Sequence, residues 1–177
     1  MSKVAVVYWS STGNTEAMAN AVAEGAKAAG AEVISFESAD FSADKVDEFD
    51  AIAFGCPAMG DEVLEEDEFE PMFSECEAKL SGKKIGLFGS YGWGDGEWMH
   101  NWEDKCKEDG AVLVADGVIC QEVWKKDSCV RLLRRSRIRK SYFVVRSQQK
   151  AYCVFSMRRE KSFQSGLFRH LCVRSRG

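Results

Sequence analysis

The chain has 177 residues, 45% of them hydrophobic, which is enough for one domain with a sizeable core. It contains no apolar run of the roughly 18 residues that a membrane span needs, and residues 1–8 lack a signal-peptide pattern. Seven cysteines without a C-x-x-C pair fit reduced thiols better than a disulfide framework. We therefore expect a cytoplasmic protein.

The formal net charge of −4 conceals two segments of opposite sign. Residues 1–120 contain 8 Lys, no Arg and 25 Asp or Glu, a net charge of −17, whereas residues 121–177 contain 16 Lys or Arg and 3 Asp or Glu, a net charge of +13. All 11 Arg lie in the second segment, which has one Ala against 17 in the first. We therefore expect one domain at residues 1–121 and a basic tail at residues 122–177.

Strand and helix patterns alternate along the acidic segment. Short apolar runs predict buried strands at residues 3–8, 32–36, 50–56, 84–91 and 111–120. Helical spacing predicts helices at residues 15–29, 69–80 and 97–109, with a short helix at 42–48. Helical crossovers between successive strands imply a parallel sheet. The predicted fold class is α/β: a doubly wound, five-stranded parallel sheet with the strand order 2-1-3-4-5.

Ligands of such a sheet bind beyond the carboxyl ends of its strands, and the first loop there is unusual. Residues 10–15 offer hydroxyls, an amide and backbone N–H groups at a helix N-terminus, which suits a phosphate, although an ordinary N-cap cluster has the same composition. The loop has no Lys or Arg and no Walker pattern, so it favours a terminal monophosphate over a triphosphate with magnesium.

The loops after the third and fourth strands suit a flat ring. Residues 56–62 form a turn at Pro57 and Gly60 that carries the adaptable side chain of Met59, although a plain surface turn would also fit. Residues 89–96 place Trp93 among four glycines. An indole exposed there can cover another flat ring, unless it folds back on its own domain.

Three segments resemble the cofactor loops of short-chain flavodoxins, those of anaerobic bacteria in particular. They are Y-W-S-S-T-G-N-T-E at residues 8–16, G-C-P-A-M-G-D-E at 55–62 and L-F-G-S-Y-G-W-G-D-G-E-W at 87–98. The resemblance covers about residues 1–121 and implies a flavodoxin-like fold that binds FMN non-covalently. One departure is Ser11, where many relatives have Gly.

The resemblance also implies roles for single residues. Met59 and Trp93 would lie on opposite faces of the isoalloxazine ring, the Gly60 carbonyl would turn towards flavin N5 when N5 gains a proton, and Glu62 would hydrogen-bond the pyrimidine edge. The residues at the phosphate would be Ser10, Ser11, Thr12, Gly13, Asn14 and Thr15. The other binding residues would be Pro57, Ala58, Asp61, Ser90, Tyr91, Gly92 and Gly94. No catalytic or metal-binding residue is expected.

These features predict a low-potential one-electron carrier that uses the semiquinone/hydroquinone couple of FMN between redox enzymes. Seven carboxylates lie in the ten residues from Asp61 to Glu70, and most should be solvated. One carboxylate at roughly 8 Å from the ring, at an effective dielectric near 20, opposes a negative charge there by about 2 kcal/mol. We expect a monomer that docks on basic patches of redox partner proteins, and neither nucleic acid nor membrane as a partner.

Two other functions are open. An FMN-dependent NAD(P)H:quinone reductase would share the fold, but it needs room for a nicotinamide over the flavin, which Met59 and Trp93 would restrict. A non-flavin signalling domain would need a phosphorylatable Asp at the end of the third strand, where this sequence has Gly55, Cys56 and Pro57.

The basic tail does not continue the pattern of the domain. A short-chain flavodoxin would end with an amphipathic helix, but neither a helical nor a strand period is sustained from residue 123 to 177. We therefore expect an atypical tail in place of the final helix, either disordered or an out-of-frame translation. The alternatives are a tail that binds membrane or nucleic acid and an extension with its own packing.

Overall fold

The structure is a computed structural model that describes residues 1–121, so the expectations for the basic tail concern residues outside the described ones. The strands are β1 (Lys3–Tyr8), β2 (Glu32–Glu37), β3 (Ala51–Gly55), β4 (Lys84–Tyr91), β5 (Val112–Leu113) and β6 (Val118–Gln121). The α-helices are α1 (Asn14–Ala28), α2 (Phe69–Glu77) and α3 (Glu97–Glu108), and the 3₁₀ helices are η1 (Ser38–Asp40) and η2 (Ala43–Glu48).

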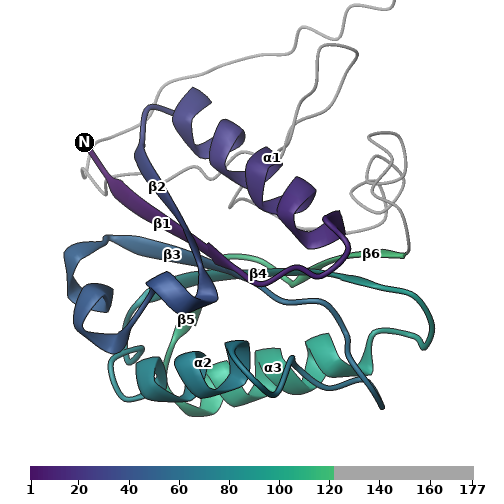
Figure 1. Cartoon of the computed structure of the whole chain (residues 1–177). Coiled ribbons are helices and arrows are strands. Elements are labelled where there is room, and N and C mark those ends of the chain that lie inside the picture. Colours follow the sequence, from purple (N-terminus) through teal and green to yellow (C-terminus); the bar gives the residue numbers. More distant parts are fainter. Residues whose placement is uncertain (122–177) are drawn as a thin grey trace, which may run out of the picture.

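These strands form one parallel sheet in the order β2-β1-β3-β4-β5, with β6 also paired to β4. The predicted α/β class and the order 2-1-3-4-5 are thereby confirmed. α2 and α3 cover one face of the sheet and α1 covers the other, as Figure 1 shows. In the described part of the chain, no helix is long and apolar enough to cross a bilayer.

The short helix expected at residues 42–48 is present as the 3₁₀ helix η2, and a second 3₁₀ helix, η1, precedes it. The buried apolar side chains here are Phe41, Val46 and Phe49. Their spacing of five and three residues does not fall on one face of an α-helix. Residues 38–48 therefore form two short 3₁₀ helices, which let these side chains reach the core.

The prediction of one fifth strand at residues 111–120 was wrong, because β5 and β6 are separate strands on the same edge of β4. Gly117, between them, donates its N–H to the carboxylate of Glu103 on α3. A Cβ at Gly117 would overlap the sulfur of Met99, also on α3. The segment between the two strands thus leaves the sheet to meet α3.

The two faces of the sheet carry cores of different composition. On the side of α2 and α3, aromatic rings meet edge to face, for example Phe73 and Trp102 with ring centroids 5.4 Å apart. On the other side, α1 presents small side chains such as Ala19 and Ala23, which lets it pack close to the strands. Because side chains pack against both faces of the sheet, the ends of the strands are fixed in position.

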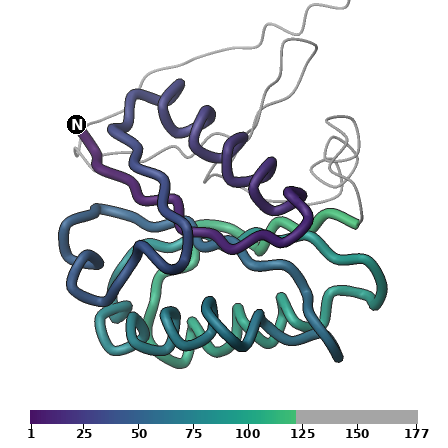
Figure 2. Tube along the Cα trace, viewed as in Figure 1, coloured from purple at the N-terminus to yellow at the C-terminus, as the bar shows by residue number. Residues whose placement is uncertain are grey.

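Because the strands are parallel, their carboxyl ends lie at one edge of the sheet; the end of β6 and the start of α1 are on the right in Figures 1 and 2. The loops after β1, β3 and β4 therefore lie together at this carboxyl edge. The described chain also ends there, since Gln121 pairs with Tyr91 at the end of β4.

Candidate functional site

Hydrogen bonds join the three loops at the carboxyl edge. The N–H of Trp9, after β1, donates to the carbonyl of Gly55 over 3.0 Å, and the N–H of Ala58, after β3, donates to the carbonyl of Ser90 over 2.9 Å. The hydroxyls of Ser90 and Thr15 are hydrogen-bonded to each other at 2.9 Å, and both side chains are buried. The three loops are therefore held in a fixed mutual arrangement.

The first loop presents unpaired backbone donors. The hydroxyl of Ser10 accepts the N–H of Gly13 over 3.1 Å, and Gly13 takes a left-handed φ of 81° just before α1 begins at Asn14. The N–H groups in the first turn of a helix have no acceptor within it, and α1 has no side-chain cap in the structure of residues 1–121. A Cβ built at Gly13 would meet no atom within 4 Å, so this helix end faces open space. The free N–H groups and the positive end of the helix dipole at this position suit an anion.

The second loop is a closed turn with unusual backbone angles. Met59 and Val63 exchange two backbone hydrogen bonds of 2.9 and 3.0 Å. Between them Gly60 has φ 46° and Glu62 has φ 55°. A positive φ at a residue with a side chain is unfavourable and persists only where other contacts hold it. For Glu62 one such contact is the N–H of Gly96, which donates to its carboxylate over 2.9 Å.

The third loop exposes an indole beside that carboxylate. Trp93 is 61% exposed, which confirms that the indole is not buried by the described part of its own domain. Gly94 has φ 89°, and a Cβ there would overlap the carboxyl group of Glu62. Glycine thus lets the second and third loops approach closely.

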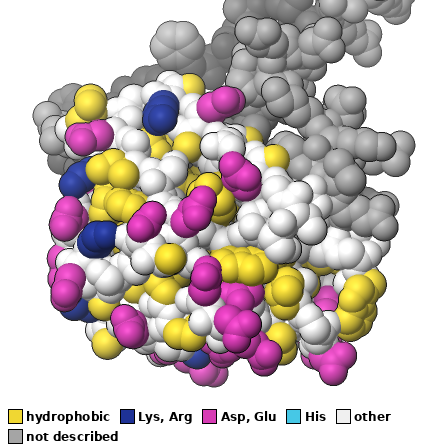
Figure 3. All heavy atoms as spheres, viewed as in Figure 1, with side chains coloured by type: hydrophobic (Ala, Val, Ile, Leu, Met, Phe, Trp, Pro, Cys, Tyr) yellow, Lys and Arg dark blue, Asp and Glu magenta, His cyan; other side chains and the backbone are white. Residues whose placement is uncertain are grey.

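The charge at this edge is negative. The carboxylates of Glu62, Asp95 and Glu97 offer oxygens within 4.8 Å of one another, and the last two residues are exposed. The three loops contain no Lys or Arg. Burial, together with the charges of Glu16 and Glu37, raises the pKa of Tyr8 at the end of β1. Figure 3 shows a face of the molecule on which Asp and Glu outnumber Lys.

Glu65 is a buried carboxylate near the second loop that the sequence analysis did not single out. The expectation that most carboxylates of residues 61–70 are solvated does not hold for it, because Glu65 is only 5% exposed and its carboxylate accepts backbone N–H groups at the start of α2. An acidic residue just before a helix was the available signal. Six other carboxylates in the same stretch carry nearly the same signal, so the sequence did not single it out.

The structure brings all the predicted binding residues to the carboxyl edge, at different depths. Buried among them are Thr15, Pro57 and Ser90. Partly buried are Ser10, Gly13, Asn14, Ala58, Met59, Glu62 and Tyr91. Exposed are Ser11, Thr12, Gly60, Asp61, Gly92, Trp93 and Gly94.

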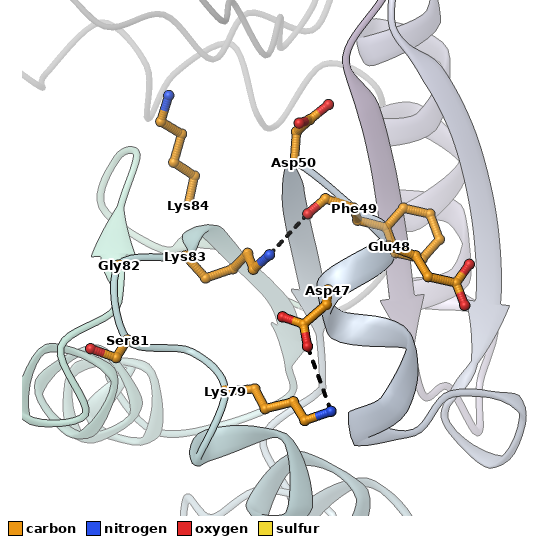
Figure 4. Close-up of a pocket in the computed structure, with 9 residues that line it drawn as sticks. All are labelled: Asp47, Glu48, Phe49, Asp50, Lys79, Ser81, Gly82, Lys83 and Lys84. Atoms are coloured by element: carbon orange, nitrogen blue, oxygen red, sulfur yellow. Dashed lines mark hydrogen bonds and ion pairs between the residues drawn. The ribbon is translucent and has the colours of Figure 1, made fainter.

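A pocket at the opposite, amino edge of the sheet is lined by none of these residues (Figure 4). It has a volume of about 450 Å³ and is lined by Asp47, Glu48, Phe49, Asp50, Lys79, Ser81, Gly82, Lys83 and Lys84. Lys83 donates to the carbonyl of Phe49 over 3.0 Å, and Lys79 pairs with Asp47 at 3.6 Å. Two of its three lysines therefore already have partners.

Known proteins match the part of the chain that contains the three loops. The family model described as Flavodoxin matches residues 6–131. A flavodoxin of Megasphaera elsdenii is 51% identical over 116 residues, which cover 66% of this chain and 85% of that protein. A flavodoxin of Clostridium beijerinckii is 49% identical over 116 residues, with 66% and 84% covered. The solution structure of two-electron reduced Megasphaera elsdenii flavodoxin matches with a TM-score of 0.67 at 48% identity, covering 73% of this chain and 94% of that one.

Proposed function

Because the chain belongs to the flavodoxin family and is an FMN-binding electron carrier rather than an enzyme, we propose that its three carboxyl-edge loops hold FMN non-covalently. The observation that carries this proposal is the hydrogen bonding that brings a helix end with unpaired N–H groups and an exposed indole to one edge of the sheet. The first suits a phosphate and the second a flat ring. Residues 1–121 would form the FMN-binding domain.

The phosphate is assigned to the first loop. The N–H groups of the first turn of α1 and the exposed hydroxyl of Thr12 would donate to it, and Gly13 leaves the space open. The buried hydroxyl of Thr15 is already bonded to Ser90, so Thr15 would contribute its backbone N–H. Ser11 is exposed and would take part at the rim.

The ring is assigned to the second and third loops. Met59 and Trp93 would cover its two faces. Gly96 holds one carboxylate oxygen of Glu62, so the other would accept a hydrogen bond from the pyrimidine edge. At Gly60 the backbone can rotate at little energetic cost, which would let its carbonyl turn and accept a hydrogen bond from a protonated ring nitrogen.

When bound, FMN supplies the one-electron transfer, and the protein sets its electrostatics. The carboxylates of Glu62, Asp95 and Glu97 would oppose the negative charge that the second electron adds to the ring. At roughly 8 Å each carboxylate would disfavour this charge by about 2 kcal/mol. For one electron this lowers the reduction potential by about 90 mV before solvent screening. We therefore propose a low reduction potential for the second electron.

The partners of this electron carrier are redox proteins. We propose that they present basic patches to the acidic surface of residues 1–120, whose net charge is −17, and that the carrier acts as a monomer. A cytoplasmic location is part of the proposal. It is supported by Cys56, Cys76 and Cys106, which are buried thiols.

Residues 122–177 are proposed to be an out-of-frame translation. The abrupt change in Arg and Ala usage supports this, and so does the 116-residue match to the Megasphaera elsdenii flavodoxin, which leaves about a third of this chain unmatched. Resequencing of codons 118–130 tests it. A clean in-frame read would exclude a frameshift.

The cofactor site is tested by titrating the purified full chain with FMN and with riboflavin. We expect FMN to quench tryptophan emission and to bind far more tightly than riboflavin, because riboflavin lacks the phosphate that the first loop would hold. A redox titration should show two separate one-electron steps. Equal affinity for both flavins, or no binding of either, would contradict the proposed site.

The quinone-reductase alternative is not favoured by the family match. It is tested by mixing the FMN-loaded protein with NADPH and a quinone in the absence of any reductase. We expect no NADPH oxidation above that of free FMN.

A further inference from the structure

Every polar group of Glu65 is engaged in a hydrogen bond although the residue is charged and buried. Its carboxylate accepts three backbone N–H groups, from Asp67 over 3.0 Å, from Glu68 over 2.9 Å and from Phe69 over 2.8 Å. These groups belong to the first turn of α2 and the residues just before it, which have no acceptor within the helix. A carboxylate there is favoured by hydrogen bonding and by the helix dipole. Glu65 therefore fixes where α2 begins.

The backbone of Glu65 faces the other way, towards the end of β3. Its N–H donates to the sulfur of Cys56 over 3.3 Å, and Cys56 is fully buried. Its carbonyl accepts the N–H of Glu70 over 2.8 Å. Burial raises the pKa of the Cys56 thiol, so the sulfur stays a neutral acceptor. Glu65 thus joins the end of β3 to the start of α2.

The loop at residues 57–64 lies between these two attachments and carries the groups assigned to the ring. Its tip is closed by the bridge between Met59 and Val63, with positive φ at Gly60 and Glu62. On the side of β3, Ala58 is held by the carbonyl of Ser90. On the side of α2, the hydrogen bonds of Glu65 hold the loop end. A shift of Glu65 would therefore move the whole tip.

We propose that Glu65 is a positioning residue for the cofactor, one that does not contact the ring but holds Met59, Gly60 and Glu62 where the ring needs them. This inference rests on the proposed FMN site. It assigns to one buried carboxylate a role that differs from that of its exposed neighbours, which act on the ring only through their charge.

The neighbour Glu66 gives a matched control, because it is exposed. Glu65→Gln and Glu66→Gln each remove one negative charge from adjacent positions. In Glu65→Gln the new amide oxygen would accept at most two of the three N–H groups, and the new NH₂ group would face the third. A purely electrostatic role predicts similar effects for both variants, whereas a positioning role predicts a large effect for Glu65→Gln alone.

The experiment measures FMN dissociation constants, the potential of the first electron, and amide hydrogen exchange at residues 67–69 in the full chain with and without FMN. For E65Q we expect the dissociation constant of FMN to rise roughly tenfold or more, consistent with the loss of a charge-assisted hydrogen bond. We also expect a shifted potential of the first electron, and amide exchange at residues 67–69 that is at least about tenfold faster. For E66Q we expect less than about a threefold change in affinity and unchanged exchange.

A second variant, Glu65→Asp, keeps the charge but shortens the side chain, and it covers the case in which E65Q does not fold. Positioning predicts that E65D also weakens FMN binding several-fold and speeds exchange at residues 67–69. The proposal would be overturned if E65D bound FMN and exchanged its amides like the wild type. It would also be overturned if E65Q showed fast exchange but had the same FMN affinity and first potential as E66Q. If the wild-type chain itself binds no FMN, the proposed function fails instead.

Discussion

At the carboxyl edge of the sheet, the first turn of α1 has N–H groups without helical acceptors and Trp93 is 61% exposed. At the amino edge, a pocket of about 450 Å³ is lined by charged side chains, but Lys79 and Lys83 there already have partners. At the amino edge the charged groups therefore have partners, whereas the carboxyl edge of the described chain presents groups that lack them. A site for an anionic, planar cofactor is indicated at the carboxyl edge by these unpartnered groups.

Adding a side chain at Gly89, near the end of β4, should have the largest effect on stability. In Gly89→Ala the new methyl group would overlap the carbonyl oxygen of Cys56, so β3 and β4 would have to move apart. We expect the free energy of unfolding to fall by about 2–3 kcal/mol, measured by urea denaturation, and FMN binding to weaken with it.

The control for Gly89→Ala is Gly82→Ala at the amino edge. Gly82 also lacks a side chain, and a Cβ there would meet no atom within 4 Å, but its φ is 72°. We expect only the strain of the left-handed backbone, about 1 kcal/mol, with unchanged FMN affinity. A larger loss at Gly82 than at Gly89 would contradict the close approach of β3 and β4.

Removal of the exposed indole should affect the cofactor and not the fold. Trp93→Ala is expected to weaken FMN binding by about 2 kcal/mol, roughly 30-fold, in a fluorescence or absorbance titration. Because the side chain is 61% exposed, the unfolding free energy of the apoprotein should change by less than about 0.5 kcal/mol.

The control for Trp93→Ala is Val112→Ala. Val112 is another exposed apolar residue, 48% exposed, on β5 at the amino edge. Val112→Ala should change neither the FMN affinity nor the unfolding free energy appreciably. An equal loss of affinity in both variants would mean that Trp93 does not contact the ring.

The buried hydroxyl pair should have a smaller effect that couples the first loop to β4. Thr15→Val keeps the shape of the side chain but leaves the Ser90 hydroxyl without its partner, which costs about 1–2 kcal/mol of stability. A double-mutant cycle with Ser90→Ala measures the coupling. We expect the double variant to lose less than the two single losses combined, and strict additivity would contradict the hydrogen bond.

Local patterns along the sequence predicted the features that depend on neighbouring residues. The alternation of apolar runs and helices predicted the strand order, and the glycines around Trp93 indicated an exposed indole. Two features depended on contacts between distant segments. Glu65 is buried only because β3 and α2 meet there, and six nearby carboxylates look the same in the sequence. Likewise, the break between β5 and β6 depends on the contact of Gly117 with α3.

The smallest effect is expected at the amino edge, where Lys79 pairs with Asp44 and Asp47, each at 3.6 Å. Both carboxylates are well exposed and Lys79 is partly exposed, so Lys79→Ala should reduce the unfolding free energy by about 0.5 kcal/mol or less. FMN affinity should be unchanged in physiological salt, because solvent screens exposed charges beyond about 8 Å. A clear change in FMN affinity would place the amino-edge pocket in the cofactor site. The contrast between the two edges would then have to be abandoned.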